Sequence, residues 1–336
     1  VNHPLPVPLN VDAIVIPERY KVTTDGQNFL LFDSGTDSNN RMLIFGTDKN
    51  LKLLESKCHW FMDFMLMDFM LFTQLYTMHA IAKGRCIPCV YALLQNKRQD
   101  TYNELFKQLS FLNVNLKPRS IMVDFEMAVI NSLKKVFPDS EIKGCFFHLS
   151  QNIYRKIKEN GLQQRYQEDS EFALKIRMLP ALAFVPPEDV VGAFEALAEL
   201  LPQNVIPIAD YFEDFYIGRP KRRGRRQATY NIDMWNMHQR AEYELPKTNN
   251  AVEGWHRSFQ SNVGSYHPTI WKFISFIQRE QALQQVHCAQ MLAGHSSQTS
   301  RKKYVDANIR ILSIVRSYRA CSIIEYLRGI ANNLSL

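Results

Sequence analysis

The order in which strand and helix patterns follow one another between residues 58 and 162 restricts the fold of this chain more than any other feature. Short runs of apolar, aromatic and β-branched residues predict strands, whereas apolar residues at every third or fourth position predict helices. Strands that alternate with helices are typical of an α/β domain whose helices pack on a mixed sheet. The predicted elements are strands 58–63, 71–81 and 86–94, helix 102–111, strand 120–124, helix 125–138, strand 141–149 and helix 153–162.

Two further patterns lie on either side of this region. Residues 1–20 hold four prolines and are interpreted as an extended lead-in. The apolar runs at 29–32 and 42–45, separated by a polar, turn-rich segment, predict a β-hairpin. Between 151 and 245 the strand patterns disappear, and an amphipathic helix is predicted at 188–201.

The remainder of the chain shows helical spacing, with helices predicted at 249–260 and 269–292 and the pattern continuing to Leu327. We therefore expect four parts. They are a lead-in with a hairpin at 1–50, a first core part at 51–150, a helical insertion at 151–245 and a second core part with C-terminal helices at 246–336.

Composition narrows the class of protein but does not identify a function. The chain has 40 Lys and Arg against 33 Asp and Glu, an excess too modest to identify a nucleic-acid-binding protein by itself. Six cysteines without regular spacing do not describe the disulfide framework of a secreted protein, so reduced thiols are expected. The most apolar stretch, 60–72, contains two Asp and is too short to cross a bilayer, so we expect no membrane partner.

Two aspartates stand where predicted strands end. Asp63 closes the first core strand and Asp124 closes the fourth. Ligands of α/β sheets gather beyond the carboxyl ends of strands, and carboxylates placed there can hold Mg²⁺. Two such ions support phosphodiester chemistry. The alternative is that each Asp only caps a turn or the N-terminus of a helix.

Glu253 is a candidate third carboxylate, and it lies on a predicted helix. Helical projection places it on one face with His256 and Arg257, a combination that suits a phosphate-rich ligand. The competing interpretation is a capping box, with Asn250 as the N-cap and Glu253 three residues later.

Two other groups of residues have both a structural and a functional interpretation. Cys145 and His148 end a predicted strand, where they are core residues or an incomplete zinc site. The basic run from 219 to 227 is a solvated loop, a phosphate-contacting loop or a nuclear import signal. The run contains Lys221, Arg222, Arg223, Arg225 and Arg226.

These residues together resemble the transposase domain of Mutator-like elements (MULE), a family of transposable elements. The resemblance covers roughly residues 25–290 in the order of the family. Its blocks are HWFMD (59–63), FTQLYTMHA (72–80), VYALLQNK (90–97), SIMVDFEMAVINSLKKVFP (120–138), IKGCFFHLSQNIYRKI (142–157), RMLPALAFVPPEDV (177–190), DYFEDFYIG (210–218), WNMH (235–238) and TNNAVEGWHRSFQ (248–260).

The resemblance implies an RNase H-like mixed sheet with a large all-helical insertion between the second Asp and the Glu. Asp63 and Asp124 match the two catalytic Asp, and Glu253 matches the Glu, which together bind Mg²⁺ or Mn²⁺. Cys145 and His148 match a structural Cys-x-x-His pair. The implied activity is cleavage and transfer of DNA strands at terminal inverted repeats. The implied location is the nucleus, and the resemblance leaves room for a homo-oligomer.

The segment after Asp63 departs from the family. Where the family reads Asp-Gly-Thr-Phe-Lys, this chain continues with Phe-Met-Leu-Met-Asp, and MDFML occurs twice in tandem at 62–71. We expect Phe64 and Met65 to crowd the metals and Asp68 to add a charge, which would weaken cleavage. Two hypotheses follow. The chain is a metal-dependent transposase, or it is a catalytically inactive, transposon-derived module that binds nucleic acid or protein.

Overall fold

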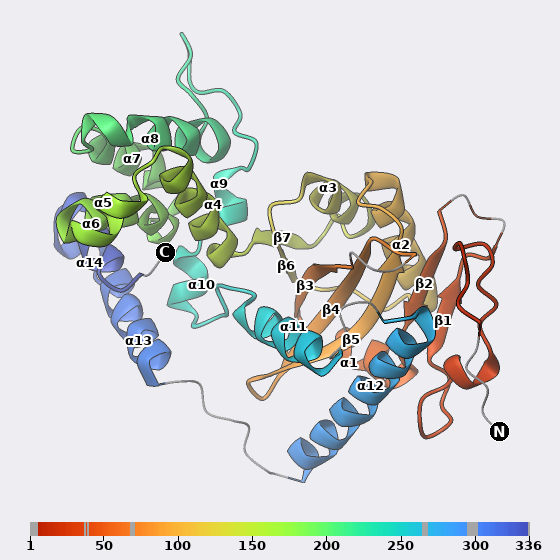
Figure 1. Ribbon diagram of the computed structural model, residues 1–336. Coiled ribbons are helices and arrows are strands. Elements are labelled where there is room, and N and C mark those ends of the chain that lie inside the picture. The colour runs from red at the N-terminus through yellow and green to blue at the C-terminus, as the bar shows by residue number, and fades with distance from the viewer. Residues whose placement is uncertain are drawn as a thin grey trace. The chain divides into compact units, whose positions relative to one another are not determined.

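The computed structural model describes residues 6–36, 38, 40–67, 71–263, 268–293 and 302–334. The chain divides into two compact units, and each unit is built from two separate segments (Figure 1). The sheet unit comprises Val1–Ile142 and Asn249–Gln298, and the helical unit comprises Lys143–Thr248 and Thr299–Leu336. No helix among the described residues is both long and apolar enough to cross a membrane.

A seven-stranded mixed sheet confirms the prediction of a mixed α/β fold. The strand order is β1-β2-β5-β4-β3-β6-β7. Strand β3 is antiparallel to β4 and parallel to β6, while β1, β2, β5 and β4 pair in antiparallel fashion. The strands are β1 Leu30–Asp33, β2 Met42–Phe45, β3 His59–Leu66, β4 Gln74–Ala82, β5 Arg85–Leu94, β6 Ser120–Val123 and β7 Glu141–Gly144. The hairpin predicted from the runs at 29–32 and 42–45 is formed by β1 and β2.

Helices cover both faces of this sheet (Figure 1). On one face Tyr76 of β4 packs against Tyr102 and Phe106 of α2. On the other face Tyr91 of β5 packs against Trp255 of α11. The helices of the sheet unit are α1 Asp48–Glu55, α2 Gln99–Leu112, α3 Met127–Val136, α11 Asn250–Val263 and α12 Ile270–Leu292, with a 3-10 turn at Glu18–Tyr20.

One hydrophobic cluster of this unit lies beneath α11 and α12. It joins apolar side chains from the N-terminal segment, the sheet and both helices, which explains why residues distant in sequence form one unit. Its buried members include Ile14, Phe29, Phe45, Met65, Met67, Leu75, Tyr91, Trp255, Phe259, Phe273, Ile274 and Ile277.

The helical unit contains, among its described residues, no strand beyond the end of β7. Its core includes Phe184 and Trp235, and the Tyr326 hydroxyl donates to the Phe184 carbonyl oxygen (2.5 Å), tying the last helix to the unit. The α-helices are α4 Phe146–Glu159, α5 Gln163–Glu168, α6 Ser170–Ala181, α7 Val190–Ala198, α8 Ile206–Phe212, α9 Ile232–Trp235, α10 His238–Glu242, α13 Lys302–Arg316 and α14 Ile323–Ala331. A π-helical turn at Glu213–Ile217 and 3-10 turns at Leu182–Phe184, Pro187–Asp189, Gln203–Val205 and Tyr318–Ala320 complete it.

The prediction of a strand from 141 to 149 is wrong beyond Gly144. Helix α4 begins at Phe146, and the backbone of Cys145 is extended just before it. Phe146, Leu149 and Ile153 are buried on one side of the helix. The apolar run was long enough for a strand, but its spacing continues with a helical period into the residues that follow. His148 therefore lies in the first turn of a helix.

The prediction that the first core strand ends at Asp63 is also wrong. Strand β3 continues to Leu66, with Asp63 opposite Thr77 and Leu66 opposite Gln74 of β4. Phe, Met and Leu extend a strand readily, and no Gly or Pro interrupts the pairing here. The first copy of the repeated MDFML therefore forms regular strand, and Asp68 lies outside the described residues.

Candidate metal centre and nucleic-acid surface

The parallel pairing of β3 with β6 places two of the predicted carboxylates side by side. Phe61 is the partner of Met122 in this register, so two residues further along Asp63 comes opposite Asp124. Neighbouring strands lie about 4.8 Å apart, and residues in register on parallel strands point to the same face. Asp63 is buried, whereas Asp124 is half-buried just after the end of β6.

Glu253 joins this pair from the first turn of α11, a helix that packs against β3. Burial and the negative charges of Asp124 and Glu253 raise the pKa of Asp63 to about 8. Burial also raises the pKa of Glu253. The structure thus brings together three carboxylates whose members are 61 and 129 positions apart in sequence, on one side of the sheet unit.

Two polar contacts join α11 to the backbone of β3 beside Asp63. The Asn249 side-chain amide donates to the Met62 carbonyl oxygen (3.1 Å). The Thr77 hydroxyl donates to the Asp63 carbonyl oxygen (3.2 Å) and lies 3.1 Å from Nε2 of His256. Sequence analysis missed Asn249 and Thr77. Helix α11 begins at Asn250, so Asn249 and not Asn250 precedes it.

His256 belongs to a buried polar chain rather than to the surface of the unit. Its Nδ1 lies 3.8 Å from Oδ2 of Asp63, and its Nε2 faces Thr77. The chain continues from Thr77 to Nε2 of His79 (2.9 Å) and from Nδ1 of His79 to the Cys86 thiol (3.3 Å). Burial lowers the pKa of His256 to about 4 and lowers that of His79 as well, so both rings are neutral at neutral pH.

The hydroxyl of Thr77 is therefore expected to stabilise the site measurably. Thr77→Val keeps the shape of the side chain but leaves two buried imidazoles without their partner, which should lower the free energy of unfolding by about 1–3 kcal/mol. Urea denaturation of the purified chain measures this change. Thr77→Ser, which keeps the hydroxyl, is the control and should lose clearly less. Equal losses in both variants would show that the methyl group, and not the hydrogen bonds, matters.

Strand geometry corrects the expectation that Phe64 crowds the metals. Successive side chains of a strand point to opposite faces, so Phe64 points away from the face that carries Asp63. Met65 shares the face of Asp63 but is buried in the apolar cluster beneath α11 and α12. The bulky residues that replace the Gly and Thr of the family are thus accommodated by packing.

Two charged residues that sequence analysis missed lie near the carboxylates. Burial and the charge of Asp124 raise the pKa of Glu126, which accepts a hydrogen bond from the Tyr102 hydroxyl (3.1 Å). Lys97, in the connection between β5 and α2, is attracted by Glu126, Asp124 and Asp63, although its burial lowers its pKa. Because Glu126 follows Asp124 by only two residues, the sequence alone could have marked it as a further acidic residue near the site.

Cys145 and His148 fall in the helical unit, at the start of α4. Cys145 is buried and His148 is half-buried. The Phe146 amide that follows Cys145 donates to the Lys247 carbonyl oxygen (3.0 Å), so this turn is held within its own unit. The predicted structural role of the pair stays a prediction.

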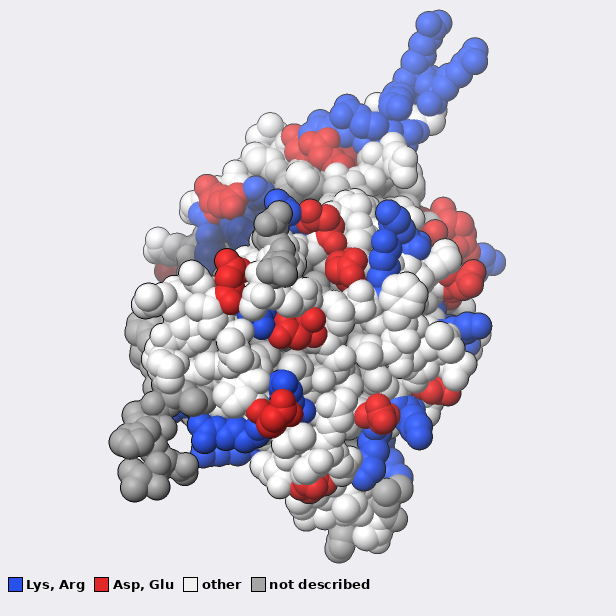
Figure 2. All heavy atoms as spheres, turned by 90° about the vertical axis from the view of Figure 1, so that its right-hand side faces the viewer, with Lys and Arg blue, Asp and Glu red and all other residues white. Residues whose placement is uncertain are grey.

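The predicted nucleic-acid-binding run forms a hairpin that protrudes from the helical unit. Lys and Arg side chains project at the top of the view in Figure 2, the height at which this segment extends in Figure 1. The amide of Lys221 donates to Gly224 O (2.9 Å), and that of Arg226 donates to Arg219 O (2.8 Å). Gly218, with φ +88°, is required at the base, because a Cβ there would lie 1.8 Å from the carbonyl oxygen of Arg226.

The basic residues at the base of this hairpin form ion pairs, whereas those at its tip are exposed. Arg219 pairs with Asp214 (2.5 Å). Arg225 pairs with Glu195 (2.5 Å) and Glu213 (2.8 Å). In contrast, Lys221, Arg222, Arg223 and Arg226 are exposed, as is Arg257 of α11 in the sheet unit. Arg225 therefore holds the base, and the exposed residues are the ones that can meet a ligand.

Comparison with known proteins confirms the resemblance inferred from the sequence. The family model of the MULE transposase domain matches residues 65–152. This match suggests a transposase-related function, with DNA as a partner and a divalent metal as a requirement. Of the three carboxylates only Asp124 lies inside the matched range. No curated protein sequence matches the chain significantly.

Proposed function

Because residues 65–152 match the MULE transposase domain, we propose that the chain cleaves and transfers DNA strands with an RNase H-like core. The observation that carries this proposal is the convergence of Asp63, Asp124 and Glu253 from β3, β6 and α11. The mixed sheet, in which β3 is antiparallel to β4 and parallel to β6, supports the RNase H-like assignment. In this proposal residues 151–245 form the helical insertion between the second Asp and the Glu.

The chemistry of the donor set fits a divalent metal. Burial first, and then repulsion by the negative charges of Asp124 and Glu253, raises the pKa of Asp63 to about 8. A divalent cation removes that repulsion, and oxygen-only donors suit Mg²⁺ or Mn²⁺. We assign Asp63, Asp124 and Glu253 as the residues that would hold the metal.

When bound, a pair of such ions activates the attacking hydroxyl and stabilises the leaving oxygen of a phosphodiester. The residues of the chain supply the geometry for this step. The parallel register fixes Asp63 beside Asp124, and the contacts of Asn249 and Thr77 fix α11 against β3. The apolar cluster beneath α11 excludes water from the buried side of the site.

The substrate in this proposal is duplex DNA that carries a terminal inverted repeat, and the place of action is the nucleus. Metal-dependent nicking of such a duplex by the full chain, lost in Asp124→Asn, is the test. DNA binding without nicking by the unaltered chain would instead support the catalytically inactive module. Localisation of a tagged chain outside the nucleus would contradict the assigned compartment.

The tip of the basic hairpin is expected to contact DNA phosphates. Replacing both Arg222 and Arg223 by Ala should lower the salt dependence of binding, reducing the slope of log K against log[NaCl] by about 1.8. Fluorescence anisotropy over a NaCl series measures this slope. The matched control replaces Lys134 and Lys135, two exposed residues of α3, by Ala. Equal slopes for both double variants would remove the hairpin from the DNA-binding surface.

A further inference from the structure

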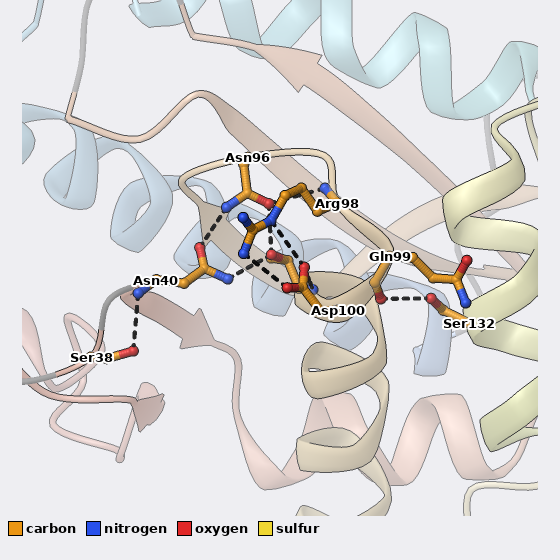
Figure 3. A network of polar contacts seen from close by, with 8 residues as sticks. Ser38, Asn40, Asn96, Arg98, Gln99, Asp100 and Ser132 are labelled. Carbon is orange, nitrogen blue, oxygen red and sulfur yellow. Dashed lines mark hydrogen bonds and ion pairs between the residues drawn. The ribbon is translucent and has the colours of Figure 1, made fainter.

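The connection between β5 and α2 is held rigidly at the carboxyl edge of the sheet. Figure 3 shows the polar network around it. The Asn96 side chain donates to Asn40 (2.8 Å) and accepts from the Thr101 hydroxyl (2.7 Å) and from the Arg98 amide (3.0 Å). The Thr101 hydroxyl also accepts from Asn40 (2.5 Å). Lys97 lies between Asn96 and Arg98, so the backbone from which it projects is fixed.

The side chain of Lys97 is held by an aromatic ring. Its Nζ lies 3.3 Å from the centroid of the Phe64 ring, a cation–π contact. Phe64 directly follows Asp63 in β3. Among the residues that the structure describes, no carboxylate lies within ion-pair distance of this ammonium, although Asp63, Asp124 and Glu126 attract it.

An ammonium in this position has a specific use. Phe64 points to the face opposite Asp63, so the ammonium over its ring lies across the edge of the sheet from that carboxylate. Asp63, Asp124 and Glu126 attract it without forming an ion pair with it, and its hydrogen-bond donors are available to an anion. A phosphate is the anion that a divalent metal and an ammonium bind together. The competing role for Lys97 is to offset the negative charge of the carboxylates without binding any ligand. The two roles predict different results.

We infer that Lys97, supported on the ring of Phe64, binds a phosphate of the DNA backbone beside the three carboxylates. This inference rests on the proposed function and deepens it. It assigns a role to Phe64, which replaces the Gly of the family at the position after Asp63. The residue that departs from the family pattern provides the surface on which the phosphate-binding ammonium rests.

The test compares Lys97→Gln with Arg98→Gln in the full chain. Arg98 is the adjacent control, since it is exposed and forms an ion pair with Asp100 (2.8 Å). The probe is a duplex that ends at the terminus of the repeat, which leaves no bond to cut, and its binding is followed by anisotropy over a NaCl series in Mg²⁺. Lys97→Gln should weaken binding about tenfold. It should also reduce the salt slope by about 0.9, whereas Arg98→Gln should change neither quantity.

Three further measurements separate the alternatives. Phe64→Leu should weaken DNA binding to an intermediate degree, because the ammonium keeps its charge but loses its support. Lys97→Arg should bind nearly as wild type. Calorimetric titration with Mg²⁺ in the absence of DNA should show that Lys97→Gln binds the metal at least as tightly as wild type, since a competing positive charge is gone.

Several results would overturn the inference. Tighter Mg²⁺ binding by Lys97→Gln with DNA binding equal to that of Arg98→Gln would make Lys97 a counter-charge only. A lower melting temperature together with weaker Mg²⁺ binding would make its role structural. If Asp124→Asn abolishes nicking while Lys97→Gln behaves as Arg98→Gln, the inference fails and the proposed function stands. If the unaltered chain does not bind DNA, both fail.

Discussion

Asp124→Asn is expected to lower metal-dependent DNA nicking by on the order of a thousandfold, the scale seen when a group central to the transition state is removed. The amide keeps the shape of the side chain but carries no charge, so it cannot neutralise a divalent cation beside Asp63. Nicking of a labelled terminal-inverted-repeat duplex in Mg²⁺ and in Mn²⁺ measures the rate. DNA binding should persist, because the basic hairpin is untouched.

Asp139→Asn is the matched control for this variant. Asp139 is an exposed residue of the same unit, just beyond α3, and its replacement should leave the rate unchanged. A rate for Asp124→Asn equal to that of Asp139→Asn would remove Asp124 from the site. A second comparison replaces residues 64–67 by Gly-Thr-Phe-Lys, the sequence usual in the family. A large gain in rate would show that the native residues hinder cleavage despite their packing.

Asp63→Asn is expected to stabilise the metal-free chain at pH 8 while abolishing its stabilisation by metal. The folded pKa of Asp63 is raised to about 8, above the value of 3.8 of an unperturbed side chain. The folded chain therefore binds more protons than the unfolded chain between these two values, so stability falls as the pH rises from about 4 to about 8. Asn cannot ionise and escapes this loss.

The size of the effect follows from the shift. About four pKa units correspond to at most about 6 kcal/mol, and relaxation of the site reduces this, so a gain of at least about 2 kcal/mol is expected at pH 8. Urea denaturation with a chelator at pH 5 and pH 8 measures it. At pH 5 the folded carboxyl is protonated, but the unfolded one, with its value of 3.8, is already largely ionised, so the difference should shrink to roughly a third of that at pH 8. A difference of the same size at both pH values would show that ionisation of Asp63 is not its cause, and Asp139→Asn should show none.

The parts of the fold that could be predicted are those in which periodicity is unambiguous. The apolar runs at 29–32 and 42–45 belong to strands on both sides of a polar loop, and the structure pairs them. The helix at 249–260 was recognisable because Val252, Trp255 and Phe259 recur on one side, and all three are buried. Pattern alone sufficed where one face of an element is apolar and the other polar.

The errors arose where apolar residues occur on consecutive positions. In GCFFHL an apolar run fits a strand or the first turn of a helix, and the choice depended on the burial of Ile153 and Ile157 further along α4. After Asp63, the pattern of apolar residues was interpreted as the end of the strand. Without Gly the chain kept pairing with β4 up to Leu66.

The supporting residues of the site could not be predicted from local sequence. Lys97 comes near the carboxylates only because β5 and β3 run in the same direction, each antiparallel to β4. Thr77 meets His256, 179 residues later, only because α11 lies on that face. Such contacts depend on topology, which no single segment contains.

The interleaving of the two units has a consequence for synthesis of the protein on the ribosome. Residues 143–248 are synthesised before the second segment of the sheet unit, Asn249–Gln298. The helical unit is complete only after its own second segment, Thr299–Leu336, has been synthesised. Until residue 277 has emerged, the apolar face of β3, β4 and β5 lacks Trp255, Phe259 and Ile277 as cover. The nascent chain thus exposes an apolar sheet surface while residues 95–277 are synthesised, and surface of this kind is prone to aggregation and is what chaperones cover.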